Sequence, residues 1–176
     1  KSFQRRGEKL VVHYELPEGS QQIETDAVFL AVGRLPNMRG LDLEKAGVEY
    51  NDRGIWVNDH LQTSQKHIYA LGDVATAHKF THTAAFQAEV ALDNITFEEK
   101  RENDLSILPW AIFTDPEIAH VGLSETEVKA KYGSNYSTFR ADANIDRYLT
   151  DLHTGGFLKV YFDEDDKVLG ADAVGH

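Results

Sequence analysis

The residues best suited to chemistry in this sequence lie within residues 68–82. An apolar run, Ile68-Tyr69-Ala70-Leu71, ends at Gly72-Asp73, and a helical pattern follows Thr81. Gly72 has no side chain, so a ligand can approach its backbone closely. Asp73 offers a carboxylate that only accepts hydrogen bonds, which suits sugar or polyol hydroxyl groups. A Gly-Asp pair alone is a common turn, but this combination indicates a small-molecule site.

Two elements must position this site. The run Ile68–Leu71 predicts a short strand inside a sheet, and ligands of α/β sheets bind outside the carboxyl ends of strands. Thr83–Ile95 predicts a helix whose positive end points toward Asp73. Small and apolar residues at near-helical spacing predict the face that this helix turns toward the sheet: Ala84, Ala88, Ala91, Leu92 and Ile95.

The segment before the site also reads as strands and turns. Residues 10–14 alternate and predict a strand, which a turn at Pro17–Ser20 ends. Ala27–Val32 is continuously apolar, which predicts a strand buried on both faces of a sheet. It runs into Gly33-Arg34-Leu35-Pro36-Asn37, which we interpret as a crossing between domains, because glycine and proline interrupt regular structure.

Shorter signals lie between this crossing and the site. Leu41–Ala46 predicts a short helix that ends at Gly47, a residue type suited to the left-handed conformation after a helix. Gly54–Asn58 predicts a short strand. The charged run Glu98–Asp104 is a second boundary candidate, which we interpret as a solvated linker.

The pattern changes after residue 104. Trp110–Phe113 and Ile118–Gly122 are short apolar segments. Ser124 and Glu127 form a capping box that predicts a helix running to Tyr132 and ending at Gly133. Two further strands are predicted, Phe157–Phe162 and Val168–Val174, joined by an acidic turn. A strand, a helix and then antiparallel strands are typical of an α+β unit.

Composition excludes several classes of function. The 176 residues include 18 basic and 29 acidic side chains, a formal net charge of −11, which argues against nucleic-acid binding. No apolar run approaches the roughly 20 residues needed to span a bilayer. The chain has no cysteine, so it holds no disulfide framework, thiolate metal site or cysteine nucleophile. We expect a cytoplasmic protein without a membrane partner.

Three motifs resemble one family, the FAD-dependent pyridine nucleotide–disulfide oxidoreductases. The stretch from Thr63 to Gly72-Asp73 looks like the family's second flavin-binding motif. The stretch Ala31–Asn37 resembles the return from the NAD(P)-binding domain to the flavin domain. Phe113–Glu125 resembles the opening of the dimerisation domain, which Phe157–Lys159 and Leu169–Ala171 continue. Ala143–Arg147 looks most like the segment of members related to mercuric reductase and dihydrolipoamide dehydrogenase.

The resemblance implies a fold and domain limits. It implies an α/β fragment of a flavoprotein with two dinucleotide-binding domains, followed by an α+β dimerisation domain. Residues 1–35 would be the tail of the NAD(P)-binding domain, and residues 36–104 the second part of the FAD-binding domain. Residues 105–176 would be the dimerisation domain, incomplete at its C-terminus, through which two copies of the chain pair.

The resemblance also implies site residues. Asp73, beside Gly72, would bind the flavin ribityl chain, and Phe80, Thr81 and His82 would lie beside the isoalloxazine. Backbone amides at the helix start would stabilise the negative charge that flavin reduction places near N1 and O2. His82 could equally be an ordinary surface histidine at a helix start. Gly33 and Arg34, at the domain crossing, complete the expected cofactor-binding set.

Features of the family that this sequence lacks predict an internal fragment. There is no Gly-x-Gly-x-x-Gly cradle for FAD or NAD(P) and no redox-active cysteine pair. The family's C-terminal His-Glu pair would follow His176. We therefore assign no catalytic residue and no metal site here. The parent would transfer hydride from NADH or NADPH through FAD to a disulfide or related acceptor, and the fragment would be inactive.

Two other classes of protein compete with this interpretation. The first is a non-enzymatic dimerisation or interaction module that keeps only the fold. The second is a monomeric flavoprotein reductase, which shares Gly-Asp motifs. The Thr114–Glu125 stretch argues against the second class, since that class lacks this dimerisation domain.

Overall fold

The chain forms two separate units. The computed structural model describes residues 2–97, 100–142, 150 and 155–175. One unit is Lys1–Leu35 and the other is Pro36–His176, so the division falls within the Gly33–Asn37 segment. Two predicted features, the Ala143–Arg147 segment and the position of His176, lie outside the described residues.

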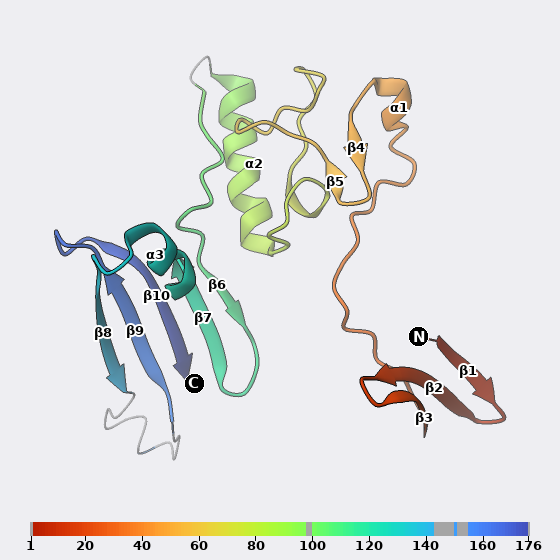
Figure 1. The fold of residues 1–176 in the computed structure, drawn as a ribbon. Coiled ribbons are helices and arrows are strands. Elements are labelled where there is room, and N and C mark those ends of the chain that lie inside the picture. The colour runs from red at the N-terminus through yellow and green to blue at the C-terminus, as the bar shows by residue number, and fades with distance from the viewer. Residues whose placement is uncertain (1, 98–99, 143–149, 151–154, 176) are drawn as a thin grey trace. The chain divides into compact units, whose positions relative to one another are not determined.

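The first unit is a three-stranded antiparallel sheet in the order β1-β2-β3 (Figure 1). Its strands are β1 (Ser2–Arg6), β2 (Lys9–Leu16) and β3 (Gly19–Thr25). The strand predicted over residues 10–14 is confirmed within β2, and its neighbours on both sides were not predicted. Val11 is 3% exposed. Phe3 and Ile23 pair with Val12 from the two neighbouring strands, and each of them is 54% exposed. One face of this sheet is therefore uncovered within its unit.

The predicted buried strand at Ala27–Val32 does not form. These residues have no regular secondary structure, and Phe29 and Val32 are 92% and 89% exposed. A strand needs a neighbour to satisfy its backbone hydrogen bonds. No described segment pairs with Ala27–Val32, and all of its residues except Val28 are exposed.

The first half of the second unit contains several short elements and one long helix. In chain order these elements are α1 (Leu43–Ala46), β4 (Tyr50–Asn51), β5 (Gly54–Ile55), the 3-10 turn η1 (Gly72–Val74) and α2 (Thr81–Thr96). Gly47 adopts φ 67° after α1, as predicted for a residue that ends a helix. The strand predicted over Gly54–Asn58 is only two residues long.

Ile68–Leu71 is not a regular strand either. It makes an isolated bridge between Gln62 and Tyr69, and the Ala70 N–H donates to the Leu61 carbonyl at 3.1 Å. Ala70 is 7% exposed, so the predicted burial holds although the predicted sheet does not form. Unlike residues 27–32, this run therefore has a partner in residues 61–63, but the pairing is too short to form a regular strand.

Helix α2 forms where it was predicted, but a different face is buried. Thr83, Gln87, Val90 and Ala91 are buried, and of the predicted face only Ala91 is among them. Ala88 is exposed, and Leu92 and Ile95 are 62% and 63% exposed. Near-helical spacing of small residues did not identify the contact face, because the face is chosen by the elements that pack against it, here η1 and the core around Leu61.

The charged run after α2 is held to the body of the unit. The Arg101 N–H donates to Asn94 Oδ1 at 2.7 Å, and Asn94 Nδ2 donates back to the Arg101 carbonyl at 2.8 Å. The Asn103 N–H donates to the Asp59 carbonyl at 2.7 Å. The described charged side chains of this run are exposed, as expected of a solvated segment, but its backbone is hydrogen-bonded to the rest of the unit.

The second half of the unit is a five-stranded antiparallel sheet with one helix. Its elements are β6 (Trp110–Ile112), β7 (Glu117–Gly122), α3 (Glu125–Tyr132), β8 (Ser137–Asp142), β9 (Phe157–Phe162) and β10 (Val168–Gly175). The strand order is β6-β7-β10-β9-β8 (Figure 1). The predicted α+β arrangement is confirmed here, and β8 is a strand that the sequence analysis did not predict.

Helix α3 follows its predicted limits and covers one face of this sheet. The Glu127 N–H donates to Ser124 Oγ, and the Ser124 N–H donates to Glu127 Oε2 at 2.8 Å, so the capping box is present. Val128 and Tyr161 are 0% and 1% exposed, which marks the contact between helix and sheet. Among the described residues, no helix has both the length and the apolar character to cross a lipid bilayer.

Candidate functional site

The candidate site begins where η1 meets the first turn of α2. Gly72 starts η1 at φ 69°, a conformation that glycine adopts without strain. A β-carbon on Gly72 would lie 3.2 Å from the Ala84 β-carbon, so the turn and the helix are in close contact. This close approach explains why a glycine precedes Asp73.

The amino end of α2 lacks a side-chain cap. Phe80 occupies the N-cap position in an extended conformation and makes no capping hydrogen bond. The first amides of a helix have no acceptor within the helix, and they carry the positive end of its dipole. The start of α2 at Thr81 is therefore suited to bind an anionic or electron-rich group.

Asp73 is half-buried in η1, and Lys79 fixes the loop that follows it. Lys79 Nζ donates to the Asp73 carbonyl at 2.8 Å and to the Thr76 carbonyl at 3.4 Å. These bonds hold the loop between the turn and the helix against η1. Sequence reasoning missed Lys79, because a lysine in a polar loop gives no signal of its own.

His82 joins the start of α2 to the strand that follows the charged run. Its Nε2 lies 2.6 Å from the Pro109 carbonyl oxygen, and because a carbonyl only accepts, Nε2 must carry the proton. The Phe80 ring stacks on the His82 ring at 5.4 Å between centroids and faces Trp110 at 6.5 Å with planes 5° apart. His82 is exposed, yet it has a structural partner that the sequence did not reveal.

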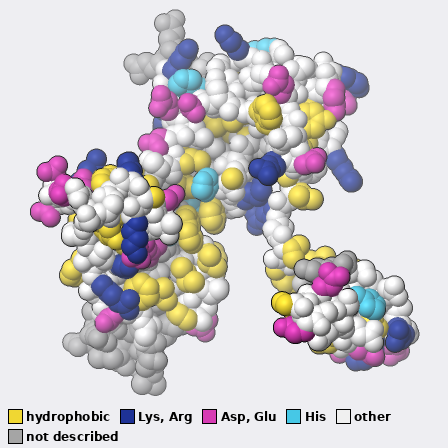
Figure 2. Space-filling model, viewed as in Figure 1, with side chains coloured by type: hydrophobic (Ala, Val, Ile, Leu, Met, Phe, Trp, Pro, Cys, Tyr) yellow, Lys and Arg dark blue, Asp and Glu magenta, His cyan; other side chains and the backbone are white. Residues whose placement is uncertain are grey.

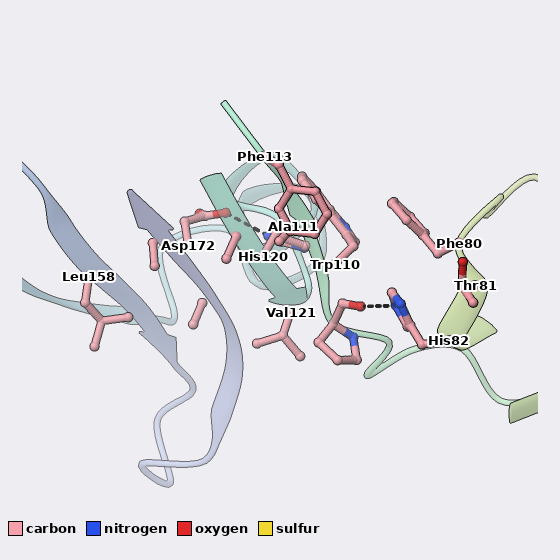
Figure 3. A pocket seen from close by; sticks show the side chains of 14 residues that line it. Phe80, Thr81, His82, Trp110, Ala111, Phe113, His120, Val121, Leu158 and Asp172 are labelled. Carbon is pink, nitrogen blue, oxygen red and sulfur yellow. Dashed lines mark hydrogen bonds and ion pairs between the residues drawn. The ribbon is translucent and has the colours of Figure 1, made fainter. Parts of the chain in front are cut away.

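These side chains border a pocket of about 680 Å³. Figure 3 shows Phe80, Thr81 and His82 on one side of it and Trp110 and the five-stranded sheet on the other. A volume of this size lies within the roughly 300–1,000 Å³ of typical small-molecule sites. The sheet side is formed mainly by small and apolar residues on the face that α3 leaves uncovered: Ala111, Phe113, Ala119, Val121, Leu158, Ala171 and Ala173.

A polar cluster that sequence reasoning missed lies at the edge of the pocket. His120 Nδ1 lies 2.7 Å from Asp172 Oδ1, and the Tyr161 hydroxyl donates to Asp172 Oδ2 at 2.6 Å. Burial, followed by the hydrogen bond to Asp172, raises the pKa of Tyr161 above its usual value, so the phenol remains a proton donor. The ring of Trp110 lies 5.1 Å from that of His120. These residues are distant in sequence, and only the pairing of β7, β9 and β10 brings them together.

The structure brings five of the seven predicted site residues into one unit. Gly72 and Asp73 lie in η1, while Phe80, Thr81 and His82 lie at the start of α2. Gly33 and Arg34 are exposed residues of the other unit, with Gly33 at φ 97°. The described residues contain no group of three or more histidine, aspartate or glutamate side chains placed to hold a metal ion.

Comparison with known sequences matches both halves of the chain to one family. The model of the pyridine nucleotide-disulphide oxidoreductase family matches residues 1–88. The model of that family's dimerisation domain matches residues 108–176.

Two relatives from Staphylococcus aureus illustrate the similarity. The chain is 36% identical over 174 residues to a mercuric reductase, an alignment that covers 97% of this chain and 32% of the relative. It is 37% identical over 178 residues to a dihydrolipoyl dehydrogenase, covering 99% of this chain and 38% of the relative. The chain thus spans about a third of the length of these curated relatives, 32% and 38%.

Solved structures agree with this assignment. The crystal structure of LpdA from Mycobacterium tuberculosis superimposes with a TM-score of 0.87 at 25% identity, covering 99% of this chain and 38% of that one. The HOCl-induced flavoprotein disulfide reductase RclA from Escherichia coli gives a TM-score of 0.83 at 27% identity, covering 98% and 40%. The three predicted motifs, the two family matches and the shared fold lead to one conclusion: the chain belongs to the pyridine nucleotide-disulphide oxidoreductase family.

Proposed function

We propose that this chain is part of a flavoprotein that transfers hydride from NADH or NADPH through FAD to a disulfide or related acceptor. The observation that carries the proposal is the uncapped start of α2 beside Gly72-Asp73. Family membership supports the same reaction class, and relatives named mercuric reductase and dihydrolipoyl dehydrogenase suggest the range of acceptors.

The residues of this site fit one end of an FAD molecule. Bound flavin supplies the two-electron chemistry, and the protein supplies orientation and electrostatics. We assign the ribityl hydroxyls to the Asp73 carboxylate and the pyrimidine edge of the flavin to the amides at Thr81 and His82. Those amides and the helix dipole stabilise negative charge near that edge. Phe80 provides an apolar ring beside the same position.

The proposed domain organisation follows the family. We assign residues 1–35 to the tail of an NAD(P)-binding domain, with Gly33 and Arg34 at the crossing. Residues 36–104 form the second part of an FAD-binding domain, and residues 105–176 a dimerisation domain. No Gly-x-Gly-x-x-Gly occurs in the sequence, so we assign the dinucleotide phosphates to parts of the protein outside this chain.

The 176-residue chain by itself is expected to purify colourless and to show no NADH or NADPH oxidation. It supplies contacts for only one end of FAD, and without a cradle for the pyrophosphate the affinity should be too low to retain the flavin. Two measurements test this: absorbance at the visible bands of flavin, at roughly 350 to 500 nm, and an assay of NADH and NADPH oxidation. A stoichiometric flavin spectrum in the purified chain would contradict the assignment of the missing contacts. The complete protein should purify yellow, and a complete protein that lacks flavin would favour the non-enzymatic module.

We also propose that the protein is a two-fold homodimer through residues 105–176. Six apolar side chains of this segment are candidates for its core or its interface: Trp110, Ile112, Phe113, Ile118, Val121 and Leu123. Of these, Ile112, Phe113 and Ile118 are 48%, 87% and 39% exposed. The others, Trp110, Val121 and Leu123, are half-buried. Apolar side chains gather over this part of the molecule in Figure 2. A second copy would remove such side chains from water, as obligate dimers do.

Light scattering coupled to size exclusion should report a dimer at micromolar concentration. The Phe113→Asp substitution is expected to shift it to monomer, because a charge would be buried in the apolar contact. Phe29→Asp is the matched control, since Phe29 is also a highly exposed phenylalanine, 92% against 87% for Phe113. This control should remain dimeric and should aggregate less, because it interrupts the exposed run Ala27–Val32. A monomeric wild-type protein, or equal effects of both substitutions, would rule out this interface.

A further inference from the structure

We propose that Gln87 is the residue that positions the Gly72-Asp73 turn for the flavin, a role that rests on the proposed function. Gln87 lies on the buried face of α2, about two helical turns beyond Thr81. Its Oε1 accepts the Gly72 N–H at 2.7 Å, and its side chain is 1% exposed. This bond connects the turn that carries Asp73 directly to the body of the helix.

The hydrogen bond accounts for a polar side chain in an apolar environment. Gly72 is buried, and its N–H makes no other hydrogen bond among the described residues. A buried backbone N–H without an acceptor is strongly unfavourable. An apolar side chain of the same length at position 87 would fill the same space and leave that N–H without a partner.

The other half of the Gln87 amide supports this assignment. Nε2 has no acceptor among the described residues, and the same is true of Thr83 Oγ1, one turn earlier on the same face. The orientation of the amide is set by Gly72, because an amide nitrogen cannot accept the Gly72 N–H. Among the described residues, the Gln87 amide therefore accepts from Gly72 through Oε1, while its Nε2 donor makes no hydrogen bond.

As a consequence, the Asp73 carboxylate and the backbone amides at the start of α2 move as one body. Asp73 follows Gly72 directly, and the amides at Thr81 belong to the same helix as Gln87. Without the bond from Gln87 to Gly72, these two parts of the site would be connected mainly through the loop between Val74 and Phe80. Holding both parts in their bound arrangement lowers the ordering cost of binding FAD.

Three variants of the complete protein separate positioning from packing. Gln87→Met keeps the length and the buried volume and removes the acceptor. Gln87→Glu keeps an acceptor oxygen in either protonation state. Thr83→Val is the matched control, because Thr83 is 0% exposed on the same helix face and its side chain makes no hydrogen bond with Gly72.

Two measurements decide the proposal: site-resolved amide exchange at Gly72 in the flavin-free protein, and FAD affinity by titration. In Gln87→Met, the Gly72 amide should exchange at least roughly tenfold faster and FAD should bind about tenfold more weakly, the scale of one lost hydrogen bond. Gln87→Glu should keep the slow exchange at Gly72. Thr83→Val should match the wild type in both measurements.

The outcomes that overturn the proposal differ from those that overturn the proposed function. Unchanged Gly72 exchange in Gln87→Met, fast exchange in Gln87→Glu, or equal loss of FAD affinity in Thr83→Val would each rule out positioning by Gln87. If Gln87→Met fails to fold, the Gln87→Glu and Thr83→Val results still decide between these cases. A wild-type protein that binds no FAD would instead refute the proposed function, and the exchange data on flavin-free protein remain interpretable.

Discussion

The Asp73→Ala substitution in the complete protein is expected to weaken FAD binding by roughly tenfold to a hundredfold. The Asp73 carboxylate is the acceptor proposed for the ribityl hydroxyls, and a hydrogen bond to a charged group contributes about 1.5–3 kcal/mol. The residue lies in η1, between a glycine held by Gln87 and a loop held by Lys79. Its position is therefore maintained by neighbours that the substitution leaves in place.

Flavin retention on dilution and titration of the flavin-free protein measure this effect. Asp73→Asn should lose less affinity, because its side chain keeps an acceptor oxygen. Asp52→Ala is the control, since Asp52 is an exposed aspartate in the turn between β4 and β5 and is not part of the site. Full retention of FAD in Asp73→Ala would show that another residue holds the ribityl chain.

The Gly170→Ala substitution is expected to lower the free energy of unfolding of the five-stranded sheet by about 3 kcal/mol. A β-carbon on Gly170 would lie 2.1 Å from the Leu123 carbonyl oxygen and 2.7 Å from the Leu123 nitrogen. Both are backbone atoms, and the Leu123 N–H donates to the Leu169 carbonyl at 3.0 Å. The clash can only be relieved by separating the segment that leads into α3 from β10.

Urea unfolding followed by circular dichroism measures this loss, and Gly133→Ala provides the comparison. Gly133 has φ 63°, so alanine is strained there, but nothing lies within 4 Å of a β-carbon at that position. Gly133 has ψ −112°, outside the left-handed helical region, so Gly133→Ala should cost only the strain of a sparsely populated backbone conformation, about 1–3 kcal/mol, without a steric clash. A loss below about 1 kcal/mol in Gly170→Ala would mean that the contact between Gly170 and Leu123 is not tight in solution. Because the proposed dimer interface is formed by residues 105–176, which include this sheet, Gly170→Ala is also expected to weaken dimerisation.

The two halves of the second unit share the candidate site. The η1 turn and α2 supply the proposed flavin contacts, while β6 and the sheet supply the opposite side of the pocket. The bond from His82 to Pro109 and the facing rings of Phe80 and Trp110 join the two halves.

The sequence by itself determined the features that depend on neighbouring residues. The capping box at Ser124, the glycine at position 133 that ends α3, and the glycine at position 47 that ends α1 are all as predicted. Each of these signals acts within one turn of the chain, so it does not depend on distant contacts. The strands β9 and β10 were also predicted, because their apolar runs are bounded by a clear turn. Three motifs in a fixed order were enough to predict the family.

Only the tertiary structure decided which side chains meet. Ala27–Val32 is as apolar as a buried strand, yet it stays exposed, because a strand requires a partner that no described segment supplies. The buried face of α2 holds Thr83 and Gln87, which no periodicity of apolar residues could predict. The bond from Gln87 to Gly72 and the cluster of His120 with Asp172 and Tyr161 join residues far apart in the sequence. Their meeting is set by packing and strand pairing, which are properties of the folded chain and not of any short segment.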